Sequence, residues 1–214
     1  MPSLFNVETI SHAALFRGCD YPWQALHNLA RYFAAQSIYK ISVSIPDSAY
    51  LENKKQIAIG EGTVIEPGAY IKGPCMIGSH CVIRHGAYIR EHVIIGDRCV
   101  IGHATEVKHS ILFNDVQCPH FNYVGDSILG NAVHLGAGAI CANLRFDAKI
   151  IYVQWNGKKM NTELKKFGAI LGDGAQVGCH TVLNPGTILG KGAMCYPNQT
   201  ITGTFESREQ IIRK

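Results

Sequence analysis

The feature that most constrains the fold of this chain is a six-residue repeat of apolar residues. The repeat occupies Ile59, Ile65, Ile71, Ile77, Ile83, Ile89, Ile95, Ile101, Val107 and Phe113. Because 47% of the chain is hydrophobic, ten such matches in one frame have a chance of about 5 in 10,000. The same period returns at Leu171, Val177, Leu183, Leu189, Cys195 and Ile201. A fixed period of this kind indicates a repeat architecture.

The residue two positions before each repeated residue is small or β-branched. These residues are Thr63, Ala69, Cys75, Cys81, Ala87, Val93, Cys99 and Thr105. Since side chains alternate faces along a strand, both positions of each repeat point inward. We therefore expect Cys75, Cys81 and Cys99 to fill the core as small buried residues. A glycine often follows the repeated residue, and we expect it to supply a turn conformation.

One six-residue unit suits a short strand followed by a corner. Three units then make a triangular coil of 18 residues, and coils stack as parallel strands about 4.8 Å apart. The pattern predicts a parallel β-helix. It does not by itself determine the hand, because ordinary crossover connections are right-handed.

The repeat divides the chain into an expected helical cap (1–44), a β-helix (45–203) and a tail (204–214). In the first part, Asp20-Tyr21-Pro22 is typical of a helix start, and we expect the helix to cover the open end of the first coil. Within the β-helix, the register slips between Phe113 and Leu129. An insertion over about 146–167 contains Asn156-Gly157 and is expected to form a β-hairpin.

Composition excludes several classes of protein. Charged residues make up 17% of the chain and the net charge is +4, without the basic runs typical of nucleic-acid binding. The apolar runs are too short to span a membrane, and the first residues do not resemble a signal peptide. Eight cysteines without a CxxC pair favour a reducing compartment. We therefore expect a cytoplasmic protein that binds neither membrane nor nucleic acid.

Three cations follow repeated residues at intervals of 18. Lys72, Arg90 and Lys108 should therefore form a column on neighbouring coils. Like charges on adjacent strands destabilise one another. The column is either a solvated, screened edge or an anion site in which a phosphate relieves the repulsion.

Two histidines have the same spacing. His85 and His103 should stack, and stacked histidines are a potential zinc site. A third ligand is not provided by His109, because six residues place it on the next face. Local hydrogen bonds are the expected role, and we predict no metal ligand.

Several longer motifs carry a family resemblance. They are GHATEVK (102–108), PHFNYVGDSILG (119–130), HLGAGAICANLRFD (134–147) and KFGAILGDGAQVG (166–178). Over about residues 45–203, the chain resembles the C-terminal acetyltransferase half of the bifunctional glucosamine-1-phosphate acetyltransferase and UDP-N-acetylglucosamine pyrophosphorylase family. The resemblance implies an all-β, left-handed parallel β-helix of hexapeptide repeats. The nucleotidyltransferase half of that family is not expected in this chain.

The resemblance also implies roles for individual residues. His120 matches the catalytic base, and Arg90 and Lys108 match residues that bind the sugar phosphate. Acceptor binding further involves Tyr123, His134, Asn143 and Lys149. Acetyl-CoA is expected beside Gly138, Ala139, Cys179 and Pro197. His134 stands where the family has asparagine, and Leu144 where it has tyrosine, which leaves the exact sugar open.

The predicted function is an N-acetyltransferase that moves the acetyl group of acetyl-CoA to the amine of a hexosamine-1-phosphate, for UDP-N-acetylhexosamine supply. A histidine can accept the amine proton near neutral pH, and the glycine-rich segment 135–139 is a candidate oxyanion donor. Direct transfer needs neither a metal nor a nucleophile such as Cys118 or Cys179. The resemblance implies a homotrimer.

Three alternatives stay open at this point. The first is a hexapeptide acyltransferase for another acceptor. The second is a non-catalytic subunit that partners a separate sugar nucleotidyltransferase. The third is a zinc protein similar to the left-handed β-helix carbonic anhydrases.

Overall fold

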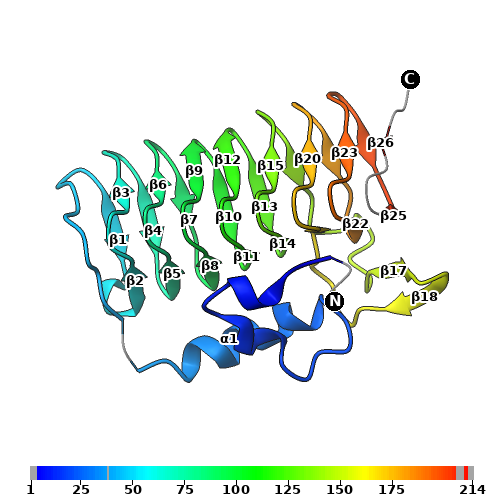
Figure 1. Cartoon of the computed structure of the whole chain (residues 1–214), viewed down its shortest axis with the longest axis horizontal. Helices are drawn as coiled ribbons and strands as arrows, with labels where there is room; N and C mark the ends of the chain where they lie inside the picture. The colour runs from blue at the N-terminus through cyan, green and yellow to red at the C-terminus, as the bar shows by residue number, and fades with distance from the viewer. Residues whose placement is uncertain (1–3, 38, 206–209, 212–214) are drawn as a thin grey trace.

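The computed structural model describes residues 4–37, 39–205 and 210–211. Its main body is a parallel β-helix in which each coil contributes one strand to each of three sheets (Figure 1). Each sheet contains eight strands, and consecutive members are three strands apart along the chain, except for one step of five where the hairpin strands β17 and β18 intervene. The predicted all-β, left-handed parallel β-helix is confirmed. No helix in the described part of the chain is long and apolar enough to cross a membrane.

The three sheets are named here in the order in which the chain visits them. Sheet I consists of β1 (Tyr50–Glu52), β4 (Tyr70–Lys72), β7 (Tyr88–Ile89), β10 (Glu106–Lys108), β13 (Tyr123–Gly125), β16 (Ile140–Cys141), β21 (Val182–Leu183) and β24 (Thr200–Ile201). Sheet II consists of β2 (Ile57–Ile59), β5 (Cys75–Ile77), β8 (Val93–Ile95), β11 (Ile111–Leu112), β14 (Ile128–Leu129), β19 (Ala169–Leu171), β22 (Thr187–Leu189) and β25 (Thr204–Phe205). Sheet III consists of β3 (Val64–Ile65), β6 (Val82–Ile83), β9 (Val100–His103), β12 (Gln117–His120), β15 (His134–Leu135), β20 (Gln176–Val177), β23 (Met194–Cys195) and β26 (Gln210–Ile211).

The interior of the β-helix is built as the repeat predicts. The repeated isoleucines form one buried core with the small residues that precede them. Cys75, Cys81 and Cys99 are fully buried in this core, as expected. Burial raises the pKa of the Cys75 thiol to about 12, so Cys75 acts as an apolar packing residue.

The register differs from the prediction at one repeated residue. Leu112, and not Phe113, pairs with Ile95 and with Leu129 and faces the interior. The corner between sheets I and II is one residue shorter in this coil and in the next one. Phe113 therefore lies outside the β-helix core, where its ring centroid is 5.1 Å from that of Phe5.

The glycines that follow the repeated residues allow neighbouring coils to stack closely, because a side chain there would meet the backbone of the next coil. A Cβ atom on Gly78 would lie 2.6 Å from the backbone carbonyl of Gly96, and one on Gly102 would lie 1.5 Å from the carbonyl oxygen of Pro119. Neither Gly78 nor Gly102 has a positive φ. The expected turn role is therefore wrong at these positions, because the limiting factor is the space between coils.

The N-terminal segment covers the outer face of sheet II and not the open end of the β-helix. It contains α1 (Gln24–Ala34) and the short helices η1 (Val7–Thr9) and η2 (Ala13–Phe16), and Figure 1 shows it lying along the β-helix. Its apolar side chains are buried against the outward residues Met76, Ile94, Ile111, Ile128, Ile170 and Ile188. An apolar outer face needs such a cover, which explains why the end-cap prediction is wrong. The open end is packed instead by Ile41, Val43, Ile45, Ala49 and Leu51, followed by η3 (Lys54–Gln56).

The predicted insertion is a β-hairpin, as expected. Strands β17 (Tyr152–Trp155) and β18 (Lys158–Asn161) pair in antiparallel fashion. Asn156 and Gly157 have φ of 49° and 72°, which is the geometry of a two-residue hairpin turn. The boundary of the predicted tail needs correction, because β25 and β26 extend sheets II and III beyond residue 203. Phe205 pairs with Leu189 only four residues after Ile201, so the six-residue period does not reveal it.

Candidate functional site

The predicted column of cations lies at the corner between sheets I and II. Pairing of Ile71 with Ile89, and of Ile89 with Val107, aligns β4, β7 and β10 on successive coils. Lys72, Arg90 and Lys108 directly follow these three residues. The column is therefore present where the 18-residue spacing predicts it.

Carboxylates accompany the cations of this column. Lys72 Nζ lies 3.5 Å from Glu52 and 4.0 Å from Glu91. Arg90 donates to Glu106 over 2.8 Å and lies 3.9 Å from Glu91. The hydrogen bond that Arg90 donates to Glu106 is the largest cause that raises the pKa of Arg90. The charges of the column are thus compensated by carboxylates, and an anion that binds Arg90 has to compete with glutamate side chains.

Asp126 joins the last cation of the column to its neighbours. Its carboxylate, 7% exposed, accepts a hydrogen bond of 3.0 Å from Lys108 and another from Asn143. Its second oxygen lies 3.0 Å from Nδ1 of His109. Burial alone would raise the pKa of Asp126, but His109, Asn143 and Lys108 outweigh burial and hold the pKa below its ordinary value. Asp126 is therefore a charged group that fixes Lys108 and Asn143 together.

Tyr123 and Asn143 lie next to this ionic cluster. Tyr123 pairs with Glu106 in sheet I. Burial, then the carboxylates of Glu106 and Asp126, raise the pKa of Tyr123. Gly125 lies between Tyr123 and Asn143. A Cβ atom on Gly125 would lie 2.7 Å from the Tyr123 hydroxyl and 2.8 Å from Nδ2 of Asn143. Gly125 thus leaves the space in which the two side chains meet.

Arg90, Lys108, Tyr123 and Asn143 are accordingly brought to one surface, which we call the ionic cluster together with Glu106, Asp126 and His109. The sequence prediction missed the last three. A signal was available for Asp126, because it lies within PHFNYVGDSILG and follows Lys108 by 18 residues.

His120 lies at the opposite edge of sheet I from Asp126, at the corner that leads from sheet III. It ends β12 and pairs with His103 one coil earlier. Its backbone N–H donates to the side chain of the buried Asn122 over 3.3 Å. The His120 side chain is exposed, so it is available to a ligand.

His85 and His103, which precede His120 on the same corner of earlier coils, stack as predicted. The rings of His85 and His103 are 5.5 Å apart and nearly parallel. Nδ1 of His85 lies 2.7 Å from the carbonyl oxygen of Pro67, and Nδ1 of His103 lies 3.0 Å from that of His85. The expected local hydrogen bonds are therefore confirmed. Among the residues that the structure describes, no group of three or more His, Cys, Asp or Glu side chains is placed to hold a metal ion.

The residues predicted to contact acetyl-CoA continue the corner that carries His120. The Gly138 N–H donates to the His120 carbonyl over 3.1 Å. Cys179 and Pro197 are exposed on the following coils, whereas the Ala139 side chain faces the core. The N–H groups of Gly138 and Ala139 both donate within the β-helix, so the glycine-rich segment offers neither of them as a free oxyanion donor.

Two predicted site residues lie elsewhere. His134 is in sheet III between Gln117 and Gln176. Lys149 lines a groove of the insertion with Arg145 and Tyr152. Neither residue has a contact with the ionic cluster among the hydrogen bonds and ion pairs of the described residues.

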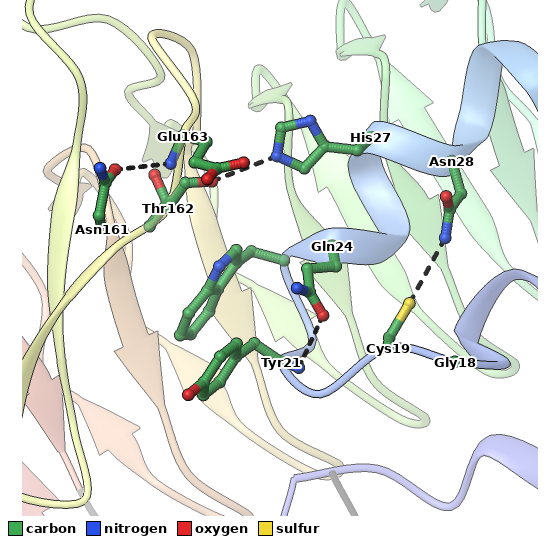
Figure 2. A pocket seen from close by; sticks show the side chains of 10 residues that line it. Gly18, Cys19, Tyr21, Gln24, His27, Asn28, Asn161, Thr162 and Glu163 are labelled. Atoms are coloured by element: carbon green, nitrogen blue, oxygen red, sulfur yellow. Dashed lines mark hydrogen bonds between the residues drawn. The ribbon is translucent and has the colours of Figure 1, made fainter.

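A separate pocket lies between α1 and the end of the hairpin (Figure 2). Nε2 of His27 is 3.2 Å from the carbonyl oxygen of Thr162, and the rings of Tyr21 and Trp23 stack at 4.8 Å. None of the predicted site residues lines this pocket. Its contacts tie the N-terminal segment to the insertion.

Comparison with known proteins identifies relatives of the chain. The family model described as the GMPPB C-terminal domain matches residues 71–211. The bifunctional protein GlmU of Methanococcus maripaludis is 32% identical over 91% of this chain and 46% of its own length. A bifunctional sugar-1-phosphate nucleotidylyltransferase/acetyltransferase of Sulfurisphaera tokodaii is 35% identical over 42% of the chain and 23% of its own length.

The chain therefore spans about half the length of the first of these relatives, and less of the second. Among solved structures, one match is an Arabidopsis UDP-N-acetylglucosamine acyltransferase. The match covers 79% of this chain and 69% of that protein, with 14% identity and a TM-score of 0.42. The resemblance expected from the motifs is confirmed by the sequence relatives. The chain belongs to the family of the GMPPB C-terminal domain and is related to the GlmU proteins over part of their length.

Proposed function

We propose that this protein transfers the acetyl group of acetyl-CoA to the amine of a hexosamine-1-phosphate. One observation carries the proposal: Arg90, Lys108, Tyr123 and Asn143, predicted independently of the structure, lie on one surface around Asp126. Sheet I connects this surface to His120, which is three residues before Tyr123. The relatives named for acetyl transfer support the same class of reaction.

In the proposed reaction, the amine nitrogen attacks the thioester carbon. A C–N bond forms and the C–S bond breaks, so CoA leaves with the electron pair on sulfur. His120 accepts the amine proton, and the thiolate takes up a proton to become the thiol. General-base catalysis of this kind contributes about 10² to 10⁴ in rate. A Cys118 nucleophile is disfavoured, because burial raises its pKa well above the ordinary value.

The phosphate of the acceptor is proposed to bind Arg90 and Lys108. It would displace Glu106 from Arg90, since an arginine fork suits phosphate as well as carboxylate. Asn143 and Tyr123 would then contact the sugar. His134 and Leu144 depart from the family pattern, so the proposal includes glucosamine-1-phosphate and similar sugars.

The proposed active form is a cytoplasmic homotrimer. The N-terminal segment already covers sheet II, which leaves sheets I and III to contact other chains. His134 and Lys149 lie apart from the ionic cluster in one chain, as expected if neighbouring chains complete the site. All eight cysteines lie in described residues and are free, which suits a reducing compartment. No metal is required in this proposal.

The test is a thiol-release assay with acetyl-CoA and a panel of amino sugars. The panel contains glucosamine-1-phosphate, galactosamine-1-phosphate, both free sugars and a nucleotide-linked amino sugar. We expect turnover with a 1-phosphate and little with the free sugars. Turnover only with the nucleotide-linked sugar would reject the proposed acceptor, and no turnover with any of them would reject the activity.

A second candidate is a non-catalytic subunit of a separate sugar nucleotidyltransferase. It is favoured by the pairing of Lys72, Arg90 and Lys108 with carboxylates, because such a column is stable without a ligand. Absence of both thiol release and acetyl-CoA binding would support this alternative. Saturable binding of acetyl-CoA would argue against it.

A further inference from the structure

A groove with an excess of positive charge lies on the insertion. Its lining includes four cations, Arg145, Lys149, Lys159 and Lys165, together with Tyr152, and no acidic side chain of the described residues. The groove has a volume of about 640 Å³, and sites for small molecules usually have about 300–1,000 Å³. Apart from Lys149, the predicted site includes none of these residues, so the groove is unexplained by the proposed acetyl transfer.

The groove adjoins the end of the ionic cluster that contains Asn143. On one side, Arg145 is two residues after Asn143, so their Cα atoms are at most about 7 Å apart. On the other side, the N–H of Phe167 donates to the carbonyl oxygen of Asn143 over 2.9 Å, and Lys165 is two residues before Phe167. Both chain segments that lead into the groove therefore start beside the proposed acceptor site, at the opposite edge of sheet I from the corner that carries the proposed base.

The charge balance of this groove differs from that of the ionic cluster. Arg145 is occupied by Asp147, which accepts two hydrogen bonds of 2.8 Å from its guanidinium. Lys149, Lys159 and Lys165 have no carboxylate within 4.0 Å among the residues that the structure describes. The three cations of the column, by contrast, all have such a partner. Unpaired cations around one groove create a positive potential that an anionic ligand relieves.

An aromatic ring accompanies these cations on the outer face of the hairpin. Ile151 and Val153 are buried and fix the inner face of β17 against the apolar cluster under the N-terminal segment. Because side chains alternate along a strand, Tyr152 lies on the other face, where it is 50% exposed. Nζ of Lys159 lies 5.0 Å from the centre of its ring. A ring that can stack on a base, beside cations that can contact phosphates, is a combination that binds nucleotides.

The two adjoining sites together select a ligand with more groups than the proposed acceptor. The ionic cluster takes a sugar and the phosphate on its C1 atom, and the groove adds room for a second phosphate and a planar ring. A nucleoside diphosphate sugar carries these groups in the same order. Such a compound forms when an oxygen of a sugar 1-phosphate attacks the α-phosphorus of a nucleoside triphosphate and diphosphate leaves.

We propose that the groove binds the α-phosphate and the nucleoside of a nucleoside diphosphate N-acetylhexosamine, while its sugar and β-phosphate occupy the acceptor site. The proposal rests on the proposed function, which assigns the ionic cluster to a hexosamine-1-phosphate. The nitrogen of this ligand is already acetylated, so the ligand competes with the acceptor and does not react. Lys159 and Lys165 contact its α-phosphate, and Tyr152 stacks on its base. The protein is thus inhibited by the product of a later nucleotidyl transfer.

The first test measures binding of UDP-N-acetylglucosamine by calorimetry, without any acetyl transfer. The groove variant is Lys159→Gln combined with Lys165→Gln, because the proposed acetyl-transfer site uses neither lysine. The matched control is Lys158→Gln combined with Lys166→Gln, two exposed lysines that are adjacent in the chain but do not line the groove. An exposed charge contact changes affinity by about two- to fivefold. The groove variant should therefore bind roughly 5- to 30-fold more weakly, and the control should bind like the wild type.

Further ligands identify which part of the molecule the groove holds. The wild type should bind UDP-N-acetylglucosamine more tightly than either UDP or N-acetylglucosamine-1-phosphate. The groove variant should lose affinity for the two uridine compounds and keep its affinity for N-acetylglucosamine-1-phosphate. Equal affinity of a folded groove variant and the wild type for UDP-N-acetylglucosamine would overturn the proposal. A loss as large for N-acetylglucosamine-1-phosphate would also overturn it, because the lysines would then act on the acceptor site itself.

Inhibition of thiol release separates this proposal from the proposed function. UDP-N-acetylglucosamine should inhibit competitively with the acceptor, and the groove variant should need roughly 5- to 30-fold more of it at an unchanged KM for the acceptor. Lysine-dependent binding by a protein without thiol release would support the groove and reject the activity. Thiol release that UDP-N-acetylglucosamine inhibits equally in the groove variant and the control, or does not inhibit, would support the activity and reject the groove.

Discussion

Nζ of Lys108 lies 3.0 Å from Oδ2 of Asp126, and their side chains are only 15% and 7% exposed. The same carboxylate also holds Asn143 and contacts His109. Two residues predicted to bind the acceptor therefore share one buried anion. Their positions depend on its charge.

Replacing Asp126 with Asn tests this dependence. The change leaves Lys108, which is largely buried, without a negatively charged partner. The free energy of unfolding should therefore fall by about 2–4 kcal/mol. Asp115→Asn is the matched control, because Asp115 pairs with Arg98 at 2.8 Å but both are about half exposed; its cost should stay below about 1 kcal/mol. Denaturant unfolding of both variants gives the comparison. Equal losses of stability in the two variants would mean that the Asp126 network stabilises the fold no more than the exposed Asp115–Arg98 pair does.

Arg90→Ala should remove most of the preference for a phosphorylated acceptor. Loss of a charge-assisted contact to phosphate costs about 1.5–3 kcal/mol, which corresponds to a roughly 10- to 150-fold higher KM for the acceptor. The KM for acetyl-CoA should change much less. Lys72→Ala, on the same column two coils from Lys108, is the control and should have little effect. An unchanged ratio of phosphorylated to free sugar in Arg90→Ala would identify the column as a structural charge network.

His120→Ala should lower turnover by about 10² or more, while acetyl-CoA binding stays close to that of the wild type. The control is His103→Ala, because His103 occupies the same corner one coil earlier and pairs with His120. Steady-state kinetics and calorimetry measure the two effects. Comparable turnover of the two variants would show that the base is a different residue.

The six-residue period predicted the interior because it reports directly on which side chains face inward. It did not reveal the short corner before Leu112, since Leu112 and Phe113 are both apolar and either satisfies the pattern. The position of the N-terminal segment required a different signal, the outward Met76 and Ile94 in sheet II. The carboxylates beside Arg90 were missed because only the cations were compared at 18-residue spacing.

Phe113→Ala should loosen the N-terminal segment and leave the β-helix folded. The Phe113 ring packs on Phe5 and Phe16 at 5.1 and 5.6 Å, and truncating a buried phenylalanine costs about 3–5 kcal/mol. Trypsin should therefore cut after the exposed Arg17 faster than in the wild type. Phe121→Ala is the matched control, because Phe121 is 56% exposed. Equal cleavage of both variants would contradict the proposed cover of sheet II.

Acid should destabilise the packing of the N-terminal segment through two histidines. Burial is the largest cause that lowers the pKa of His12, against the opposing effect of Asp97, and burial followed by His109 lowers the pKa of His92. His12 contacts the Tyr32 hydroxyl at 2.8 Å, and His92 packs against Phe33, so both meet α1. The unfolded chain binds these protons at about pH 6.5 and the folded chain only at lower pH. Stability is therefore complete above pH 6.5 and falls as the pH drops toward the folded-state pKa values.

The measurement compares the free energy of unfolding at pH 7.5 and pH 5.5. His12→Gln removes one of the two titrating groups, so it should lose less stability on acidification than the wild type. The control is His180→Gln, at an exposed corner of the β-helix far along the chain from α1, and it should follow the wild type. Asp126 does not contribute in this range, because its lowered pKa confines its effect to pH values below about 4. If His12→Gln loses as much stability as the wild type, protonation of His12 is not opposed by its burial under α1.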